Sequence, residues 1–237
     1  MKNILKSKII LLLIIVLSLI LVGCTGGEGP GKKDNFNEAN YELTTTPTFE
    51  KTLTAAEAKA DLAKAVASLA TAKSYSYTQK LTGEWDSQYT YEGVTKIDVS
   101  GASPMASIEL VGNTNYAFYI ANNKGYLNLN GDKSSFDLEG DLSNLIDATQ
   151  EALGAYTQFD PESITDASLE FAGVDKDNAT VIKFNLNAET RVMIVIHNEK
   201  IMKVLYSNDD AIEYVAKYDY NAVTVELPSD LDSYNAE

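Results

Sequence analysis

The sequence of 237 residues predicts an α+β fold: one curled antiparallel sheet of about ten strands with two main helices packed on its concave face. Two segments show the hydrophobic period of 3.6 residues that is typical of amphipathic helices. Many short segments alternate with a period of 2, and Asn- and Gly-rich turns connect them as hairpins. Because a sheet of this width must twist and curl, its concave face is where both helices can bury their apolar residues.

The first helix is predicted over residues 55–72. Thr54-Ala55-Ala56-Glu57 forms a capping box, in which the Thr54 hydroxyl and the Glu57 carboxylate each accept a hydrogen bond from the other residue's backbone amide. The segment is rich in Ala, Leu, Lys and Glu and contains no Gly or Pro. Its apolar stripe consists of Ala58, Leu62, Val66 and Leu69.

A first run of strands follows this helix. One face of its first strand carries Tyr75, Tyr77, Gln79, Leu81 and Trp85, at alternate or nearly alternate positions. Turn chemistry at 122–125 and 130–131 separates the later strands. The expected strands of this run cover residues 75–85, 89–99, 105–111, 116–120, 126–129 and 136–138.

A second helix and a second run of strands complete the chain. Asp141 is a suitable N-cap, and Gly154 lies near the expected end of the helix. Its apolar stripe consists of Leu142, Leu145, Ile146 and Leu153. The strands after it are expected at 169–171, 181–186, 192–196, 201–206, 212–220 and 223–227, with Pro228 ending the last.

The N-terminus has the features of an export signal. Lys2, Lys6 and Lys8 precede an apolar stretch over residues 9–22. That stretch is shorter than the roughly 20 residues of a permanent membrane helix, but it suits a signal peptide. Leu21-Val22-Gly23-Cys24 resembles the lipobox of bacterial lipoproteins. The resemblance implies a diacylglyceryl group on the Cys24 thiol, cleavage before Cys24 and an extracytoplasmic protein anchored to the cell membrane; the alternative is an uncleaved anchor with an incidental cysteine.

Composition defines the rest of the organisation. Residues 1–23 are the expected signal peptide, residues 24–53 a flexible linker rich in Gly, Thr, Asn and Pro, and residues 54–237 a single domain. The mature chain would hold 16 basic and 34 acidic residues, a net charge of −18. So acidic a protein is repelled by phosphate backbones, so we expect no nucleic-acid partner. Cys24 is the only cysteine, so no internal disulfide can form.

The order of elements also resembles a known family. The shared features are a helix before the strand Ala72-Lys73-Ser74-Tyr75-Ser76-Tyr77, a mid-chain helix, and the C-terminal patterns Tyr218-Asp219-Tyr220-Asn221 and Val225-Glu226-Leu227-Pro228. Over about residues 54–234, these features resemble the LolA, LolB and LppX superfamily and related lipoproteins of Gram-positive bacteria. The resemblance implies a half-open β-barrel with helices across its mouth and a concave face that holds lipid.

The sequence offers few groups for catalysis or metal binding. His197 is the only histidine and lies at the end of an expected strand, so a Ser-His-acid site is not indicated. We expect no enzymatic activity, no cofactor and no transition metal. Residues 175–178 and 208–210 group oxygen ligands closely; they form either ordinary turns or weak calcium sites.

The high tyrosine content is the remaining feature that bears on function. Fourteen tyrosines stand against seven phenylalanines, and many fall on expected strands. Tyrosine favours strands and half-buried surfaces in general, and it also suits the wall of an amphipathic cavity. The first functional hypothesis is therefore a carrier of lipid or another hydrophobic ligand; the alternative is a cell-surface interaction or sensor module without a small ligand. The candidate ligand-binding residues are Tyr75, Tyr77, Trp85, Leu142 and Ile146.

Overall fold

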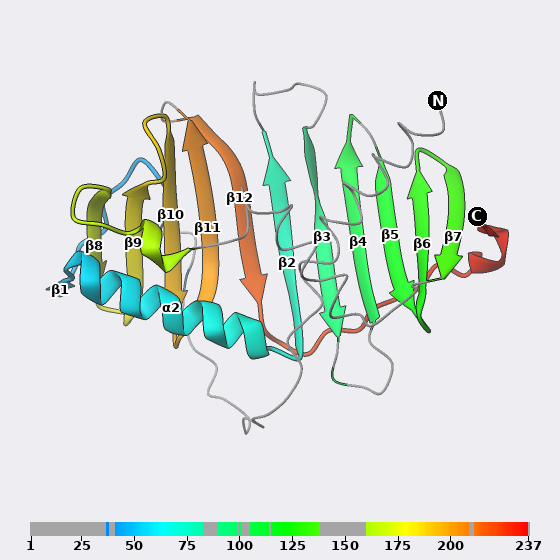
Figure 1. The fold of residues 1–237 in the computed structure, drawn as a ribbon, viewed down its shortest axis with the longest axis horizontal. Coiled ribbons are helices and arrows are strands. Elements are labelled where there is room, and N and C mark those ends of the chain that lie inside the picture. The colour runs from blue at the N-terminus through cyan, green and yellow to red at the C-terminus, as the bar shows by residue number, and fades with distance from the viewer. Residues whose placement is uncertain are drawn as a thin grey trace.

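One large antiparallel sheet dominates the computed structural model, which describes residues 37, 41–82, 90–98, 100, 105–113, 115–137, 160–208 and 211–236 (Figure 1). Its strands are β1 (Lys51–Thr52), β2 (Ser74–Leu81), β3 (Tyr91–Asp98), β4 (Met105–Gly112), β5 (Tyr116–Ala121), β6 (Lys124–Leu129), β7 (Asp132–Asp137), β8 (Leu169–Val174), β9 (Ala179–Asn185), β10 (Thr190–His197), β11 (Lys200–Asn208), β12 (Ala211–Asp219) and β13 (Asn235–Ala236).

The two predicted runs of strands are halves of this single sheet. The strand order is β1-β8-β9-β10-β11-β12-β2-β3-β4-β5-β6-β7-β13. All neighbours are antiparallel except β13, which pairs in parallel with β7. The halves join where β12 pairs with β2, with Tyr218 opposite Tyr77. Across the described residues the sheet has thirteen strands rather than about ten, with the two-residue strands β1 and β13 at its open edges.

The hairpin turns follow from the residues at their tips. Asn122 and Asn123 between β5 and β6 have φ angles of 53° and 59°. Asn130 and Gly131 between β6 and β7 have φ angles of 53° and 96°. Two successive residues with positive φ give a turn whose twist matches that of the strands, and Asn and Gly tolerate this conformation best. The meander predicted from these turns is confirmed.

The strand predicted at 223–227 is wrong. These residues follow β12 without pairing to any strand. Both edges of β12 are already occupied, by β11 and by β2, so the chain has no free edge to pair with at that point. The segment instead continues from the end of β12 towards β7 (Figure 1). The backbone amide of Val223 donates to the Ser74 hydroxyl over 3.0 Å, and Val225 is buried.

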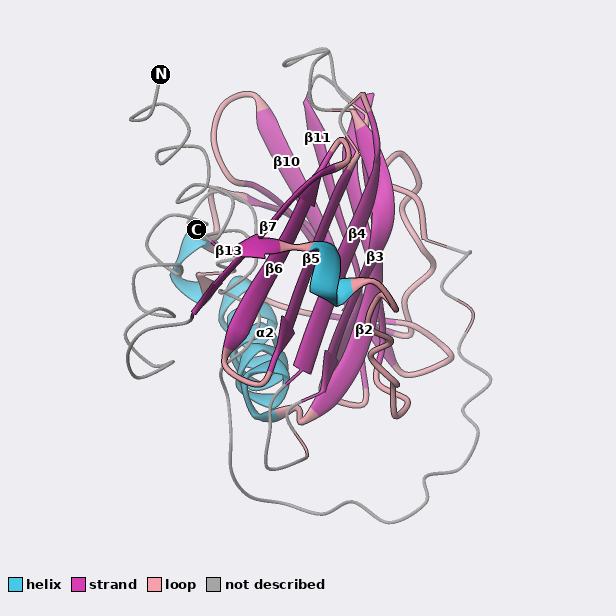
Figure 2. Cartoon of the chain, turned by 90° about the vertical axis from the view of Figure 1, so that its right-hand side faces the viewer, coloured by secondary structure: helices cyan, strands magenta, loops and turns pink. Residues whose placement is uncertain are grey.

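Helix α2 (Ala55–Thr71) is the only α-helix in the described ranges, which otherwise contain the short 3₁₀ turns η3 (Pro161–Ser163) and η4 (Leu231–Ser233). Its main contacts are with β8, β9, β10 and β11. Figure 2 shows the helix lying against one face of the twisted sheet. We call this the inner face and the opposite one the outer face. The second predicted helix, at 141–154, lies outside the described residues, so the structure supports one helix on the sheet rather than two.

The capping box of α2 is confirmed. The Glu57 amide donates to Thr54 Oγ1 over 3.3 Å, and the Thr54 amide donates to Glu57 Oε2 over 2.9 Å. Ala58 and Leu62 of the predicted stripe are fully buried, while Val66 and Leu69 are partly buried against the same core. The small side chains of the alanines among these residues let the helix approach the strands closely.

The capping box predicts an unusual titration. A hydrogen bond from Lys51, followed by those from the amide and hydroxyl of Thr54, lowers the pKa of Glu57 to about 2. Since the folded pKa lies below the ordinary value of 4.5, the carboxylate stabilises the helix start above about pH 4.5, and this contribution is lost as the pH falls through about 2. NMR titration of wild type, K51Q and T54V should show the midpoint near 2 moving upwards in both variants. A wild-type midpoint of 4.5 would contradict the capping geometry.

Residues 41–53, predicted as part of the linker, are docked on the sheet: their first part packs on the outer face, and Lys51–Thr52 form the edge strand β1. Tyr41 and Leu43 are only 3% and 1% exposed. They share a cluster with Val181, Met193 and Leu205, whose chain neighbours point to the inner face. We call residues 41–53 the N-terminal strap. Composition hides the strap because its few buried apolar residues are separated by Thr, Glu and Pro.

The strap is held by specific contacts. The Tyr41 hydroxyl donates to the carboxylate of Asp175, and Lys203 Nζ donates to the Tyr41 carbonyl. The Phe49 ring lies 5.8 Å from that of Phe171. Gly173 makes room for Phe49, since a Cβ at this position would lie 2.2 Å from the Phe49 ring. The strap and α2 together bury both faces of β9, β10 and β11, which explains their nearly continuous apolar sequences.

Candidate functional site

The inner face of the sheet centre carries a row of tyrosines from three neighbouring strands. Because side chains alternate along a strand, Tyr75, Tyr77 and Gln79 of β2 all face inwards. Pairing of β2 with β12 places Tyr218 directly opposite Tyr77. The remaining members come from β11, from β12 and from the residue that follows β12; they are Tyr206, Tyr214 and Tyr220.

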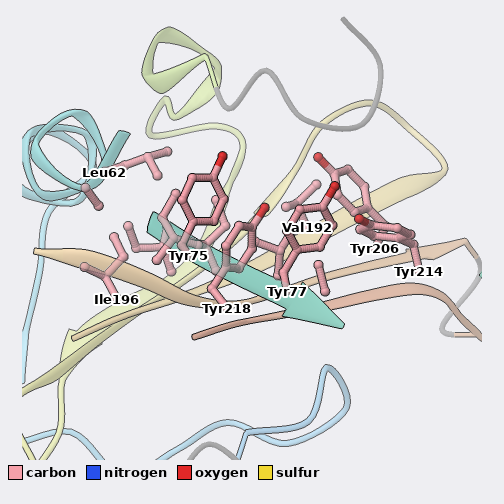
Figure 3. Close-up of a cluster of buried hydrophobic side chains, with 14 of the residues drawn as sticks. Leu62, Tyr75, Tyr77, Val192, Ile196, Tyr206, Tyr214 and Tyr218 are labelled. Carbon is pink, nitrogen blue, oxygen red and sulfur yellow. The ribbon is translucent and has the colours of Figure 1, made fainter. Parts of the chain in front are cut away.

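These rings form contacts across the strand boundaries. The Tyr77 and Tyr218 rings stack with centroids 5.2 Å apart, and Tyr220 stacks on Tyr218 at 6.4 Å and on Tyr75 at 6.1 Å. Figure 3 shows the rings in a row beside Leu62 of α2, with the hydroxyl groups of Tyr75, Tyr77 and Tyr218 directed away from the sheet. The face is therefore aromatic at its base and polar at its top.

A small polar network lies among the rings. Gln79 Nε2 donates to Thr95 Oγ1 over 3.2 Å, and the Tyr214 hydroxyl lies 3.5 Å from Gln79 Oε1 in donating geometry. Gln79 is 7% exposed and Thr95 is fully buried. Buried polar groups of this kind need partners, and the network supplies them within the sheet. It also places an amide and a hydroxyl where they can contact a polar group of a ligand.

The environment keeps the phenols neutral. Burial raises the pKa of Tyr75 and of Tyr218 well above the ordinary value of 10.0. Burial, reinforced by the nearby Tyr218, does the same for the pKa of Tyr77 and of Tyr214. At physiological pH these groups are uncharged hydrogen-bond donors and acceptors. They suit an uncharged or weakly polar group better than they suit a nucleophilic role.

The apolar inner face continues beyond the tyrosines. Opposite Thr95 in the next strands lie Ile108, Phe118 and Leu127, each 7% exposed or less. Helix α2 makes its main contacts on the other half of the sheet, at β8 to β11. The inner face is thus one apolar surface that extends from below the helix, across the tyrosine row, to β6.

The structure brings together part of the predicted site. Tyr75 and Tyr77 lie side by side on the inner face, 4% and 5% exposed. Trp85, Leu142, Ile146 and the expected lipidation residue Cys24 all lie outside the described residues. The prediction placed Gln79 on the same strand face as Tyr77 but missed Tyr218 and Tyr214 as neighbours of Tyr77. Only their strand positions were visible in the sequence, because the pairing of β12 with β2 joins residues about 140 positions apart.

The acidic turns and the histidine acquire structural explanations. Asp175 is buried, and its carboxylate accepts from the amides of Asp177 and Ala179, both over 2.9 Å, and from the Tyr41 hydroxyl. This carboxylate is engaged as a turn and strap contact, which favours the ordinary turn over a calcium site. Asp209 and Asp210 lie outside the described residues. Within the described ranges, no three His, Cys, Asp or Glu side chains group as metal ligands. His197 is the last residue of β10, as predicted.

In the described residues, fold and site together define a class: an α+β protein with an open antiparallel sheet, one helix on a tyrosine-rich inner face and a chain segment on the outer face. No protein-family model matches the sequence, and no curated protein matches it. The solved structures that are similar in part include two mycobacterial proteins. The lipoprotein LppX of Mycobacterium tuberculosis has a TM-score of 0.45 at 11% identity, covering 72% of this chain and 99% of LppX. LprF from Mycobacterium bovis has a TM-score of 0.42 at 11% identity, covering 73% and 97%.

No helix within the described residues is long and apolar enough to cross a bilayer.

Proposed function

We propose that this chain is an extracytoplasmic lipoprotein, anchored through Cys24, that binds a hydrophobic ligand such as a lipid on the inner face of its sheet, without enzymatic activity. The observation that carries the proposal is the tyrosine row on an otherwise apolar surface. Rings of Tyr77 and Tyr218 offer flat apolar contact, and their neutral hydroxyls offer hydrogen bonds at the same place. Such a combination fits a ligand with an acyl chain and a small polar group.

The apolar part of the site supplies the affinity. Each methylene transferred from water contributes about 0.8 kcal/mol, so a long acyl chain gains several kcal/mol beyond the cost of immobilising it. Ile108 and Phe118 extend the tyrosine row in a direction away from the main contacts of α2. A chain lying along this direction would have its polar end near Gln79 and Tyr214.

The anchor sets the range of the domain. Cys24 is 17 residues before Tyr41, where the N-terminal strap begins, so the connection spans at most about 60 Å when fully extended. The strap fixes the point of attachment to the outer face, opposite the tyrosines. In the proposed arrangement the attachment point on the outer face does not cover the tyrosines, while the domain stays near its membrane.

Lipid extraction tests the proposal. All described elements lie within residues 41–236, so the chain from residue 25 onward keeps the whole described fold. We expect mass spectrometry of an organic extract of this natively purified chain to recover lipid, and a fluorescent fatty acid to load into the delipidated protein. Y77F should weaken loading about fivefold or more through the lost hydroxyl, while Y126F, on the outer face, should not. The carrier function fails if no lipid is recovered and none can be loaded.

The alternative is a cell-surface interaction or sensor module in which the sheet is scaffold only. The near-complete burial of Tyr75 and Tyr77 favours this alternative, because tyrosines in a closed core without a ligand would be buried to the same extent. Cross-linking on intact cells separates the two. A specific protein partner, together with an empty and unloadable inner face, would support the module.

A further inference from the structure

We propose a second ligand site on the outer face, for a small amphiphilic anion that carries one phosphate or carboxylate group on a short alkyl chain. The site is a groove of about 580 Å³ beside the N-terminal strap. That volume is in the range of small-molecule sites in proteins. Strands β11, β12, β2 and β3 form its floor, and Glu42 of the strap forms part of its wall. Its charged lining residues are Glu42, Lys80, Glu92, Lys203 and Lys217.

Three lysines converge on this groove. Lys203 of β11 and Lys217 of β12 are directly opposite each other in register. Thr78 of β2 is opposite Lys217, and Lys80 follows it on the same face. Two carboxylates line the same groove, since Glu92 Oε2 lies 3.7 Å from Lys80 Nζ and Glu42 lies beside Lys203. The groove therefore has a net charge of +1 in a chain whose net charge is −15. Neighbouring cations along a groove raise the local concentration of anions.

Lys203 is held in place before any ligand arrives. Its side chain is only 3% exposed, and its Nζ donates to the Tyr41 carbonyl. Glu42 Oε1 lies 3.8 Å from the same Nζ, at the outer limit of an ion pair, and the Glu42 side chain is 53% exposed. A fixed ammonium group needs little further ordering to accept an anion. The Glu42 carboxylate is thus a weakly held anion of the protein itself, at the edge of the groove.

Apolar residues lie next to the lysines. Leu205 and Val215 line the groove between Lys203 and Lys217 on one side and Lys80 on the other. Val94 of β3 also lines it and is 37% exposed. On the next strand Val111, opposite Glu92, is 64% exposed and extends this apolar surface. The arrangement suits an alkyl group attached to the anion rather than an inorganic ion alone.

This groove is separate from the inner-face site. Leu205 points outwards while its neighbours Val204 and Tyr206 point inwards, so the sheet itself lies between the two sites. The inference therefore does not depend on the proposed lipid carrier function. Gln79 is the one residue of the inner-face network that also lines this groove, so the test uses substitutions at other positions.

Butyl phosphate is the probe for the test, with inorganic phosphate and butanol as its two halves. We expect isothermal titration of the chain from residue 25 onward to show butyl phosphate binding more tightly than either half, and more weakly as salt is added. K217Q should weaken binding about tenfold, since a charge-assisted contact is lost. E42Q should strengthen it, because the competing carboxylate is removed.

Matched controls define the location. E50Q changes an exposed acid on the same strap outside the groove, and Y77F changes the inner face; both should bind butyl phosphate as the wild type does. K80Q, at an exposed position, gives a second reading if K217Q fails to fold. The site is refuted if butyl phosphate does not bind, if both lysine variants bind normally, or if Y77F weakens binding as much as they do. Binding to phosphatidate vesicles without binding of butyl phosphate would also refute it, in favour of a membrane surface.

Discussion

Replacing Leu62 by alanine is expected to lower the free energy of unfolding by about 2–5 kcal/mol. Leu62 is fully buried where α2 meets the inner face, in the same cluster as Tyr75 and Ile194. Alanine removes three carbon atoms and leaves a cavity, because the flanking Ala58 and Ala65 are too small to fill it. Urea unfolding of the chain from residue 37 onward, followed by circular dichroism, measures the loss.

L69A is the matched control for L62A. Leu69 lies two turns further along α2 and is only partly buried against the core. The same chemical change there should cost clearly less. If L62A and L69A had equal effects, the helix would be docked as closely at Leu69 as at Leu62, contrary to the burial of the two side chains. A loss below 1 kcal/mol for L62A would contradict the docking altogether.

Local signals were sufficient for the helix and for most strands. The capping box at Thr54 and Glu57 marks the start of α2 within the first residues that form it. Alternation of Tyr75 and Tyr77 with polar residues identifies the inward side of β2, and the Asn turns fix the order of the hairpins. Each of these signals depends on residues within a few positions of one another. Short-range physics therefore accounts for them.

Features that depend on contacts between distant parts of the chain could not be predicted from the sequence. Val223 to Leu227 alternate like a strand, but their pairing depends on whether a sheet edge is free near the end of β12, and β2 already occupies it. Tyr218 joins the candidate site only because β12 pairs with β2. Tyr41 and Leu43 resemble isolated apolar residues of a linker until Met193 and Leu205 provide a surface for them. In all three cases the deciding partner lies far away along the chain.

Replacing Tyr41 by alanine is expected to lower the free energy of unfolding by about 3–5 kcal/mol, a loss that a flexible linker residue could not produce. The Tyr41 ring is 3% exposed against the outer-face cluster. Its hydroxyl donates to the buried carboxylate of Asp175, which would lose one of its three donors. The substitution also loosens the backbone carbonyl that accepts from Lys203, a cation with a side chain only 3% exposed.

Two further variants separate the contributions to this loss of stability. Y41F keeps the ring and removes the hydroxyl, so it should cost about 1–3 kcal/mol through the weakened hydrogen bonding of Asp175. T46A, at an exposed position of the same strap, should leave the stability unchanged within about 0.5 kcal/mol. Hydrogen exchange should show faster exchange in β10 and β11 in Y41A, because the strap covers the outer side of both strands. If Y41A unfolded at the same urea concentration as the wild type, residues 41–53 would act in solution as the linker that their composition predicts, and the outer groove would lose its Glu42 wall.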